Sequence, residues 1–177
     1  ILSFNGAKII NYTTGQVIYQ NVLSAHDVQA ICAEAQALGV AAITYSDQAL
    51  YSTSAQNQYV QKEATINKMP VVEVADLAAA TTFDTPKCLL VDHPEKLVEV
   101  EKHMKQKFPK LSIYRSEPYF LEIVPLGVDK AFSLNILLEH YGLTAQNLIA
   151  LGDGFNDLSM IQFAGMGVAV QNAQQVV

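Results

Sequence analysis

Charged side chains are scarce in this sequence, and basic ones are scarcer still. Charged residues make up 16% of the 177 positions, with 11 lysines and arginines against 17 aspartates and glutamates. A net charge of −6 with scattered lysines argues against binding to nucleic acid or to an anionic membrane surface. No apolar run approaches the roughly 20 residues that a membrane-spanning helix needs. The composition therefore predicts that neither nucleic acid nor a membrane is a partner.

Cysteine is also rare. Cys32 and Cys88 are the only two, and they form neither a CxxC motif nor a spacing typical of metal ligands. This pattern indicates reduced core thiols in a cytoplasmic protein, and it leaves a single disulfide open as an alternative. The four histidines are dispersed, and no pair has the spacing of zinc ligands, so we expect them on helix surfaces.

Apolar residues are plentiful, at 50% of the chain, which is enough for one large core or two small ones. The most informative apolar run covers residues 148–151 and lacks alternation, which is typical of a strand buried on both faces of a parallel sheet. Gly152 and Asp153 follow it, and a helical pattern starts at Leu158. Ligands of open α/β sheets gather just beyond the carboxyl ends of the strands, so this turn is a candidate binding site.

Two carboxylates stand in that turn, four residues apart. Asp153 and Asp157 offer the oxygen ligands that Mg²⁺ prefers, and Mg²⁺ is usually held by one or two carboxylates together with substrate phosphate oxygens. The alternative is structural: Asn156 or Asp157 can cap the following helix, and Asp153 can be a plain turn residue. The complete string from Gly152 to Asp157 favours the functional interpretation.

A lysine at the start of the preceding helical pattern is a second candidate. Asp129 can cap a helix that Gly142 ends, and Lys130 falls in its first turn. A cation there is unfavourable against the helix dipole, so Lys130 needs either solvent or an anionic partner. It is also the only lysine or arginine after Arg115, in a segment with six carboxylates. From the residues alone, a solvated lysine and a lysine bound to an anionic partner both remain open for Lys130.

Several segments resemble motifs of the haloacid-dehalogenase-like (HAD) phosphatases. The string GDGFNDLSMI at 152–161 resembles their fourth motif, and GVDKAFSLNILLEHYGL at 127–143 resembles their third, with Lys130 at the lysine position. The tail GMGVAVQNA at 165–173 and the opening FNGA at 4–7 are similar to the Cof-type branch. The resemblance covers most of the chain and is strongest from Tyr119 to Ala173.

The resemblance and the pattern of elements together predict an α/β fold. Its core is a partial, Rossmann-like parallel sheet, into which an α/β cap is inserted, with an antiparallel sheet and helices on one face. Residues 1–14 are expected to form a core strand and linker, 15–118 the cap, and 119–177 the C-terminal part of the core. Within these segments we expect a strand over 1–7, a hairpin over 8–19, helices starting near 24 and 94, and a short strand with a surface loop over 48–61.

The resemblance implies a Mg²⁺-dependent phosphatase acting on small phosphate esters, chiefly sugar phosphates, through an aspartyl-phosphate intermediate. By that resemblance Asp153 is a Mg²⁺ ligand, and Asp157 completes or orients the metal shell. Lys130 is the catalytic residue that contacts nucleophile and phosphate. Asn156 is expected to contact phosphate or substrate, and Asn5 is expected either to contact phosphate or substrate or to be a turn residue.

One family feature is missing. Members carry their nucleophile in an Asp-x-Asp motif, which occurs nowhere in this sequence. We therefore expect a fragment that is inactive by itself, with the nucleophile supplied by a preceding segment of the intact protein. The alternatives are a non-catalytic module for binding or assembly and a phosphomutase. A split core exposes sheet edges and apolar surface, which leaves homo-oligomer formation open.

Overall fold

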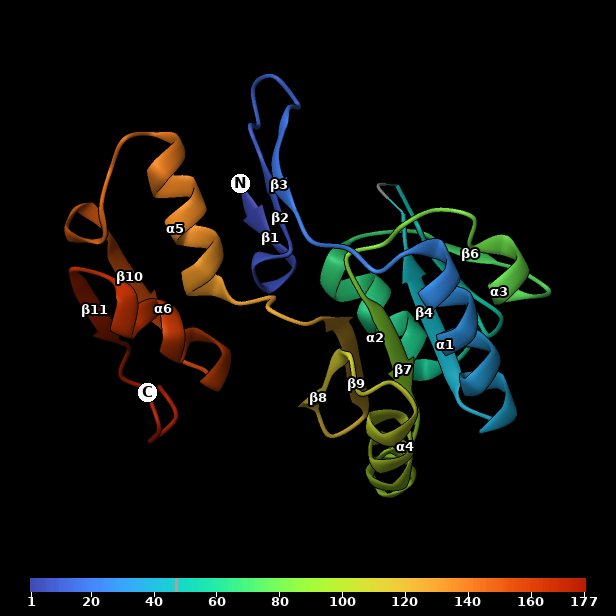
Figure 1. Ribbon diagram of the computed structural model, residues 1–177. Coiled ribbons are helices and arrows are strands. Elements are labelled where there is room, and N and C mark those ends of the chain that lie inside the picture. The colour runs from blue at the N-terminus through green and yellow to red at the C-terminus, as the bar shows by residue number, and fades with distance from the viewer. Residues whose placement is uncertain (47) are drawn as a thin grey trace. The chain divides into compact units, whose positions relative to one another are not determined.

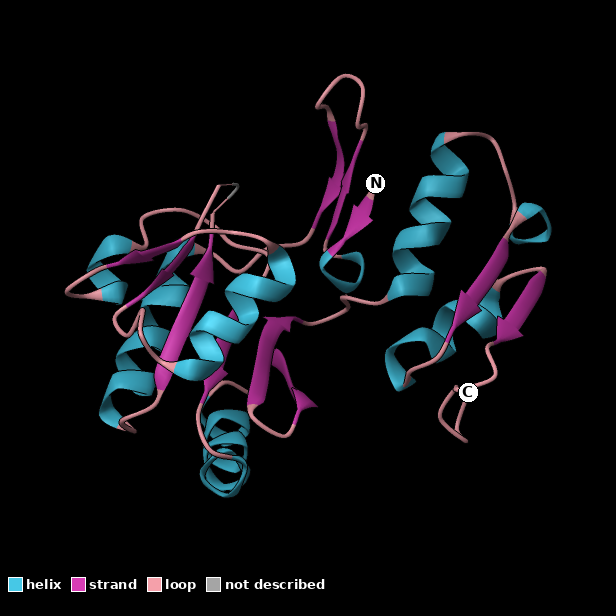
Figure 2. Cartoon of the chain, turned by 180° about the vertical axis from the view of Figure 1, so that it is seen from behind, coloured by secondary structure: helices cyan, strands magenta, loops and turns pink. Residues whose placement is uncertain are grey.

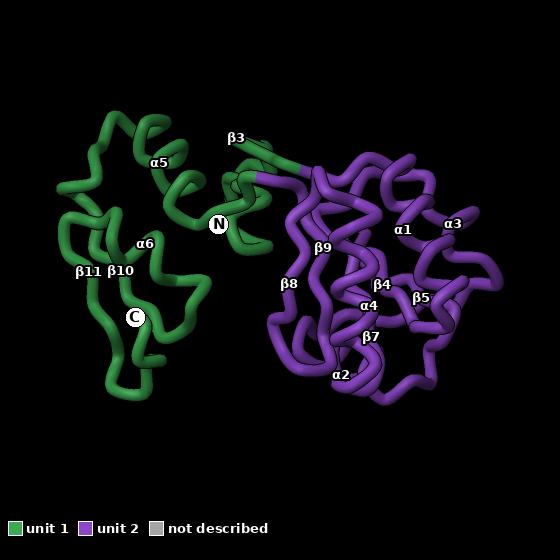
Figure 3. The backbone as a smooth tube through the Cα atoms, turned by 60° about the horizontal axis from the view of Figure 1, so that its bottom comes forward, with its two compact units in different colours: residues 1–21, 127–177 green, residues 22–126 purple. Residues whose placement is uncertain are grey.

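A computed structural model describes residues 1–46 and 48–177, which form two compact units. Unit 1 comprises residues 1–21 and 127–177, and unit 2 comprises residues 22–126 (Figure 3). Unit 2 is thus inserted between the two segments of unit 1, and its boundaries lie at 21/22 and 126/127 where the sequence suggested 14/15 and 118/119. They differ because strand β3 (Val17–Gln20) pairs with β2 (Lys8–Ile10) in unit 1, whereas β9 (Phe120–Pro125) pairs within unit 2.

Unit 2 is built on a six-stranded sheet in the order β6-β5-β4-β7-β9-β8 (Figure 1). The strands besides β9 are β4 (Ala41–Tyr45), β5 (Leu50–Ser52), β6 (Val71–Glu73), β7 (Cys88–Val91) and β8 (Leu111–Glu117). Neighbouring strands are antiparallel except for β5 and β6, which are parallel. The expected antiparallel cap sheet is thus present with one parallel edge pair.

Helices cover both faces of this sheet. On one face α1 (Ala25–Ala37), α3 (Leu77–Ala80) and α4 (Pro94–Lys107) bury the main apolar cluster, which includes Ile31, Leu90 and Leu97. On the other face lies α2 (Gln58–Asn67), since its Glu63 accepts a hydrogen bond from Tyr45 of β4 at 2.7 Å. The expectation of helices on one face holds for α1, α3 and α4 and is wrong for α2.

Helix α2 also replaces part of the loop expected over residues 48–61. The Asn57 side chain caps it by accepting from the Tyr59 amide at 2.8 Å. Its buried Glu63 lies 3.3 Å from Lys87 Nζ, which in turn lies 3.1 Å from the buried carboxylate of Glu122. Buried polar groups of this kind need partners, and here they come from α2, from the residue before β7 and from β9.

Unit 1 begins with a three-stranded antiparallel sheet of β1 (Leu2–Ser3), β2 and β3. The strand expected over residues 1–7 stops after Ser3. Phe4, Asn5 and Gly6 have φ values of +52°, +54° and +105°, in the left-handed region where strands do not continue. The segment forms a 3₁₀ turn over Phe4–Gly6 instead.

The rest of unit 1 contains α5 (Lys130–His140), a parallel pair of strands and a short helix. Strands β10 (Ile149–Gly152) and β11 (Met166–Ala169) are joined through α6 (Leu158–Phe163), and 3₁₀ turns lie at Ala145–Asn147 and Phe155–Asp157 (Figure 2). β10 was expected to be buried on both faces, which is wrong within the described part of the chain. Ala150 is 5% exposed, but Ile149 and Leu151 on the opposite face are 61% and 58% exposed.

Two smaller expectations are confirmed. Cys32 and Cys88 are free and buried, and all four histidines are exposed. Across residues 1–46 and 48–177, we find no helix with both the length and the apolar character needed to cross a membrane.

Candidate active site

The turn after β10 is organised by one carboxylate. Asp157, only 6% exposed, accepts hydrogen bonds at Oδ2 from the backbone amides of Asp153 at 3.0 Å and Gly154 at 3.2 Å. Its other oxygen, Oδ1, accepts a hydrogen bond from Lys130 Nζ in a salt bridge. Both oxygens are therefore bound by donors of the protein, and the Asp157 side chain joins the β10 turn to the first residue of α5.

This arrangement of the Asp157 side chain requires a glycine at position 152. A Cβ placed there would lie 2.8 Å from both Cγ and Oδ2 of Asp157, closer than such atoms approach one another. The end of β10 can therefore run alongside the Asp157 carboxylate only because Gly152 has no side chain.

Asp157 is an ionised group in a mostly buried place. Burial by itself raises the pKa of this carboxyl, but the hydrogen bonds from Lys130 and from the amides of Asp153 and Gly154 outweigh it, so that the pKa lies below the ordinary 3.8. Asp157 thus carries a full negative charge at neutral pH, which also supplies the anionic partner that Lys130 needs at the start of α5.

A second contact connects the opening turn with the same region. Asn156 Nδ2 donates to Asn5 Oδ1 at 3.2 Å. The opening turn is held against α5, because the buried hydroxyl of Ser133 donates to the Gly6 carbonyl at 2.5 Å. A Cβ on Gly6 would lie 2.6 Å from that hydroxyl and 2.7 Å from the Asp129 carbonyl, so only glycine permits this approach.

Asp153 differs from Asp157 in its surroundings. Its backbone takes part in the turn, donating to Asp157 and accepting from the Gln174 amide at 2.8 Å, while the residue itself is exposed. Asp153 therefore offers carboxylate oxygens to an incoming ion. Residues 1–46 and 48–177 contain no group of three or more His, Cys, Asp or Glu side chains arranged to hold a metal.

These residues are compatible with Mg²⁺, to which they would contribute a single carboxylate. Mg²⁺ retains several waters and takes one or two carboxylates plus substrate phosphate oxygens, so a single available carboxylate is compatible with it. Asp153 can supply that carboxylate, whereas Asp157 is already committed to Lys130 and two amides.

The structure brings the predicted residues together in two pairs, Lys130 with Asp157 and Asn5 with Asn156. Sequence reasoning missed Ser133, which fixes the opening turn on α5. A serine inside an apolar helical pattern was a readable signal, because a buried hydroxyl needs a partner.

Comparison with known proteins shows the family of this sequence. The profile of the haloacid dehalogenase-like hydrolases matches residues 1–177. The chain belongs to this family. A provisionally named phosphatase of Haemophilus influenzae is 31% identical over 176 residues, which are 98% of this chain and 65% of that relative.

Two further relatives of this HAD-like chain are informative. The crystal structure of a haloacid dehalogenase-like hydrolase from Bacteroides thetaiotaomicron is 45% identical, with a TM-score of 0.95 over 99% of this chain and 66% of that one. The Bacillus subtilis protein YcsE, a 5-amino-6-(5-phospho-D-ribitylamino)uracil phosphatase, is 43% identical over 72 residues, or 41% of this chain and 29% of that protein. The chain spans about two thirds or less of the relatives it matches.

Proposed function

We propose that the intact protein is a Mg²⁺-dependent phosphatase of small phosphate esters, chiefly sugar phosphates, acting through an aspartyl-phosphate intermediate. The observation that carries the proposal is the Lys130–Asp157 salt bridge beside the exposed Asp153, at the carboxyl end of a parallel strand. That position is where α/β sheets bind ligands. The nucleophilic aspartate belongs to a part of the protein outside this chain.

Each residue has a separate part in this proposal. Asp153 is the carboxylate that holds the metal. Asp157 shapes the turn by binding the amides of Asp153 and Gly154, and it fixes the Lys130 amine. Lys130 contacts the nucleophile and the phosphate, and Asn156, steadied by Asn5, donates a hydrogen bond to phosphate or substrate.

The charges explain why these groups are needed. Attack by a carboxylate on a phosphate ester brings two anions together, which is slow unless positive charge offsets the repulsion. When bound, Mg²⁺ supplies part of that charge as a Lewis acid. The Lys130 ammonium supplies a second part, and its salt bridge to Asp157 orients it before substrate arrives.

The proposed substrate class rests on the relatives. YcsE is named for a phosphate ester on a ribityl chain, which supports a polyhydroxylated phosphate monoester as substrate for this protein too. The free, buried thiols support a reducing, cytoplasmic setting. Association with a second copy also belongs to the proposal, because the apolar side chains of Ile149 and Leu151 are exposed on one face of β10.

The test is hydrolysis of a generic phosphate ester by the intact protein, with and without Mg²⁺. Asp153→Asn should abolish Mg²⁺-dependent turnover, and Lys130→Met should lower kcat by about 100- to 1,000-fold, the usual effect of losing one charge-stabilising donor. Glu139→Gln, an exposed change on α5 in the same unit, should leave turnover unchanged. Retained activity in Asp153→Asn would remove Asp153 from the metal site. Phosphate transfer to a second sugar position instead of water would refute the hydrolase assignment.

A further inference from the structure

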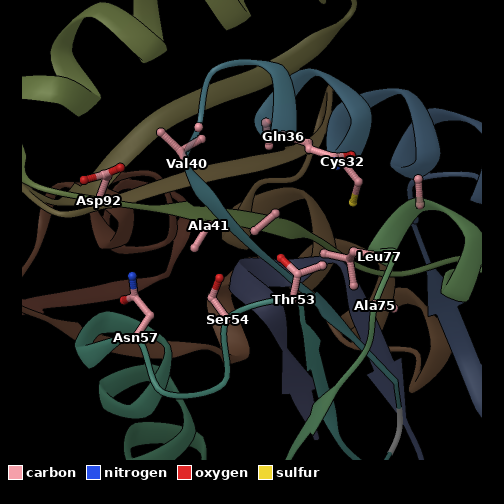
Figure 4. Close-up of a pocket in the computed structure, with 14 residues that line it drawn as sticks. Cys32, Gln36, Val40, Ala41, Thr53, Ser54, Asn57, Ala75, Leu77 and Asp92 are labelled. Carbon is pink, nitrogen blue, oxygen red and sulfur yellow. The ribbon is translucent and has the colours of Figure 1, made fainter.

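A half-open pocket of about 340 Å³ lies in unit 2, and no residue of the candidate active site belongs to its lining. It is lined by the last turns of α1, the start of β4, the segment between β5 and α2, and the start of α3, and it is open to solvent (Figure 4). Its volume falls in the lower part of the range of about 300–1,000 Å³ for small-molecule sites. The size therefore suits one small ligand.

The cavity lies at one particular end of the unit 2 sheet. Asp92 and Ala41, which line it, lie at the end of β7 where that strand finishes. The chain enters unit 2 close to Leu23, which pairs with Thr85, and leaves it after Leu126, the residue that follows Pro125. Thr85 and Pro125 both lie at the end of the sheet where β7 begins. A ligand in the cavity is thus bound at the opposite end of the sheet from both connections to unit 1.

Uncharged hydrogen-bonding groups line one side of the cavity. The hydroxyls of Thr53 and Ser54 point toward Ala41 at the start of β4 (Figure 4). Neither hydroxyl has a hydrogen-bond partner among residues 1–46 and 48–177, so both can serve a ligand. Asn57 uses its Oδ1 to cap α2, which leaves its Nδ2 group directed into the same space. Gln36 adds a second carboxamide from the end of α1.

The lining carries almost no net charge. Its one carboxylate, Asp92, is paired with Lys96 at 2.9 Å, and Lys96 also donates to the Gly39 carbonyl at 2.6 Å. No lysine, arginine or aromatic residue belongs to the lining that the structure describes. The charge balance disfavours a phosphorylated ligand, and the lack of a ring disfavours a planar base that needs stacking.

We propose that this cavity binds an uncharged polyhydroxy compound, namely a monosaccharide or a polyol without phosphate. Its hydroxyls pair with Thr53, Ser54 and the two carboxamides, while its C–H surface rests on small apolar side chains such as those of Val40 and Leu77. The proposal concerns a second site and does not depend on the phosphatase activity proposed above.

The experiment is a titration of the ¹⁵N-labelled chain with glucose, ribitol and glucose 6-phosphate, followed by amide chemical shifts. Glucose or ribitol should shift the amides of Gly39, Thr53 and Ser54 saturably, with a dissociation constant on the order of 1 mM for a small ligand held by a few hydrogen bonds. Glucose 6-phosphate should shift them at least tenfold more weakly. The double variant Thr53→Val, Ser54→Ala should weaken binding about tenfold. Thr82→Val, an exposed change in the same unit, should not alter it.

A thiol measurement gives an independent readout. Cys32 lines the cavity, whereas Cys88 is fully buried behind it and does not. A hydrogen bond with Cys32 and burial raise the pKa of the Cys88 thiol well above its ordinary range, so Cys88 should react much more slowly with methyl methanethiosulfonate. Saturating glucose or ribitol should slow modification of Cys32 several-fold and leave Cys88 unaffected.

Three results would overturn the proposal. The first is that neither glucose nor ribitol gives saturable shifts at the cavity amides. The second is that glucose 6-phosphate binds there as tightly as glucose, which would refute the ligand class. The third is that Cys32 reacts at the same rate with and without ligand. None of these bears on phosphate ester hydrolysis, so failure here is distinguishable from failure of the proposed function.

Discussion

Replacing Lys130 by methionine removes the cation from Asp157 while keeping most of the apolar stem of the side chain. The Asp157 side chain is 8% exposed and the Lys130 side chain is 20% exposed, so water cannot hydrate the Asp157 carboxylate fully in this position. In Lys130→Met the β10 turn must therefore open more often to let water reach that charge. The change tests whether the salt bridge holds the turn together.

The magnitude follows from what is lost and what remains. Breaking a buried ion pair costs about 3–5 kcal/mol, and losing a hydrogen bond to a charged group costs about 1.5–3 kcal/mol. Lys130 is partly exposed, and Asp157 keeps its two amide donors, so the lower figure applies. We expect a loss of about 2 kcal/mol in the free energy of opening, or roughly 30-fold in the population of the open turn.

The assay is amide hydrogen exchange of Asp153 and Gly154, because both N–H groups donate to the Asp157 carboxylate. Their exchange should become roughly 30-fold faster in Lys130→Met. The matched control is Lys102→Met, an exposed position on α4 in unit 2. If both amides exchange at the same rate in wild type, Lys130→Met and the control, the salt bridge does not organise the turn and the reasoning fails.

Three further predictions concern unit 1. The pKa of Asp157 in the folded protein is lowered from 3.8, so its contribution to stability is present above that value and is lost as the pH falls through the folded pKa. Below about pH 4, the free energy of unfolding measured in urea should therefore decrease more in wild type than in Asp157→Asn. Gly6→Ala should cost about 2 kcal/mol or more in thermal unfolding, since its φ is +105° and the new methyl group meets Ser133, whereas Gly15→Ala, with φ +72° and open space, should cost about 1 kcal/mol; equal costs would argue against the close contact. Leu151→Glu should change the unfolding free energy by less than about 0.5 kcal/mol but reduce self-association of the chain in analytical ultracentrifugation, and unchanged association would show that the bare face of β10 is not the contact.

The sequence was most informative where structure is decided locally. The strand, turn and helix over residues 148–164 could be read directly, because an apolar run, a glycine and a helical period follow one another within 17 positions of the chain. The Lys130–Asp157 contact could be anticipated because a cation at a helix start needs an anion, and the chain offers few other basic groups nearby.

The errors arose where distant segments decide the structure. Whether β9 belongs to unit 1 or unit 2 depends on its pairing with β7 and β8, which its alternating pattern does not reveal. The turn at residues 4–6 includes Asn5-Gly6, a pair that readily takes positive φ, and the strand expectation for residues 1–7 overlooked that local signal. Helix α2 was missed because its buried face includes a charged residue, Glu63, whose partners come from other strands.

The two junctions at 21/22 and 126/127 enter and leave unit 2 from the same end of its sheet. An insertion whose two connections lie at one end is a self-contained module. Unit 2 can be removed and the two ends of unit 1 joined by a short linker, or it can be exchanged for a different module, without a change in the path of the chain in unit 1. One inserted module can therefore be substituted for another while the residues of unit 1 keep their own fold.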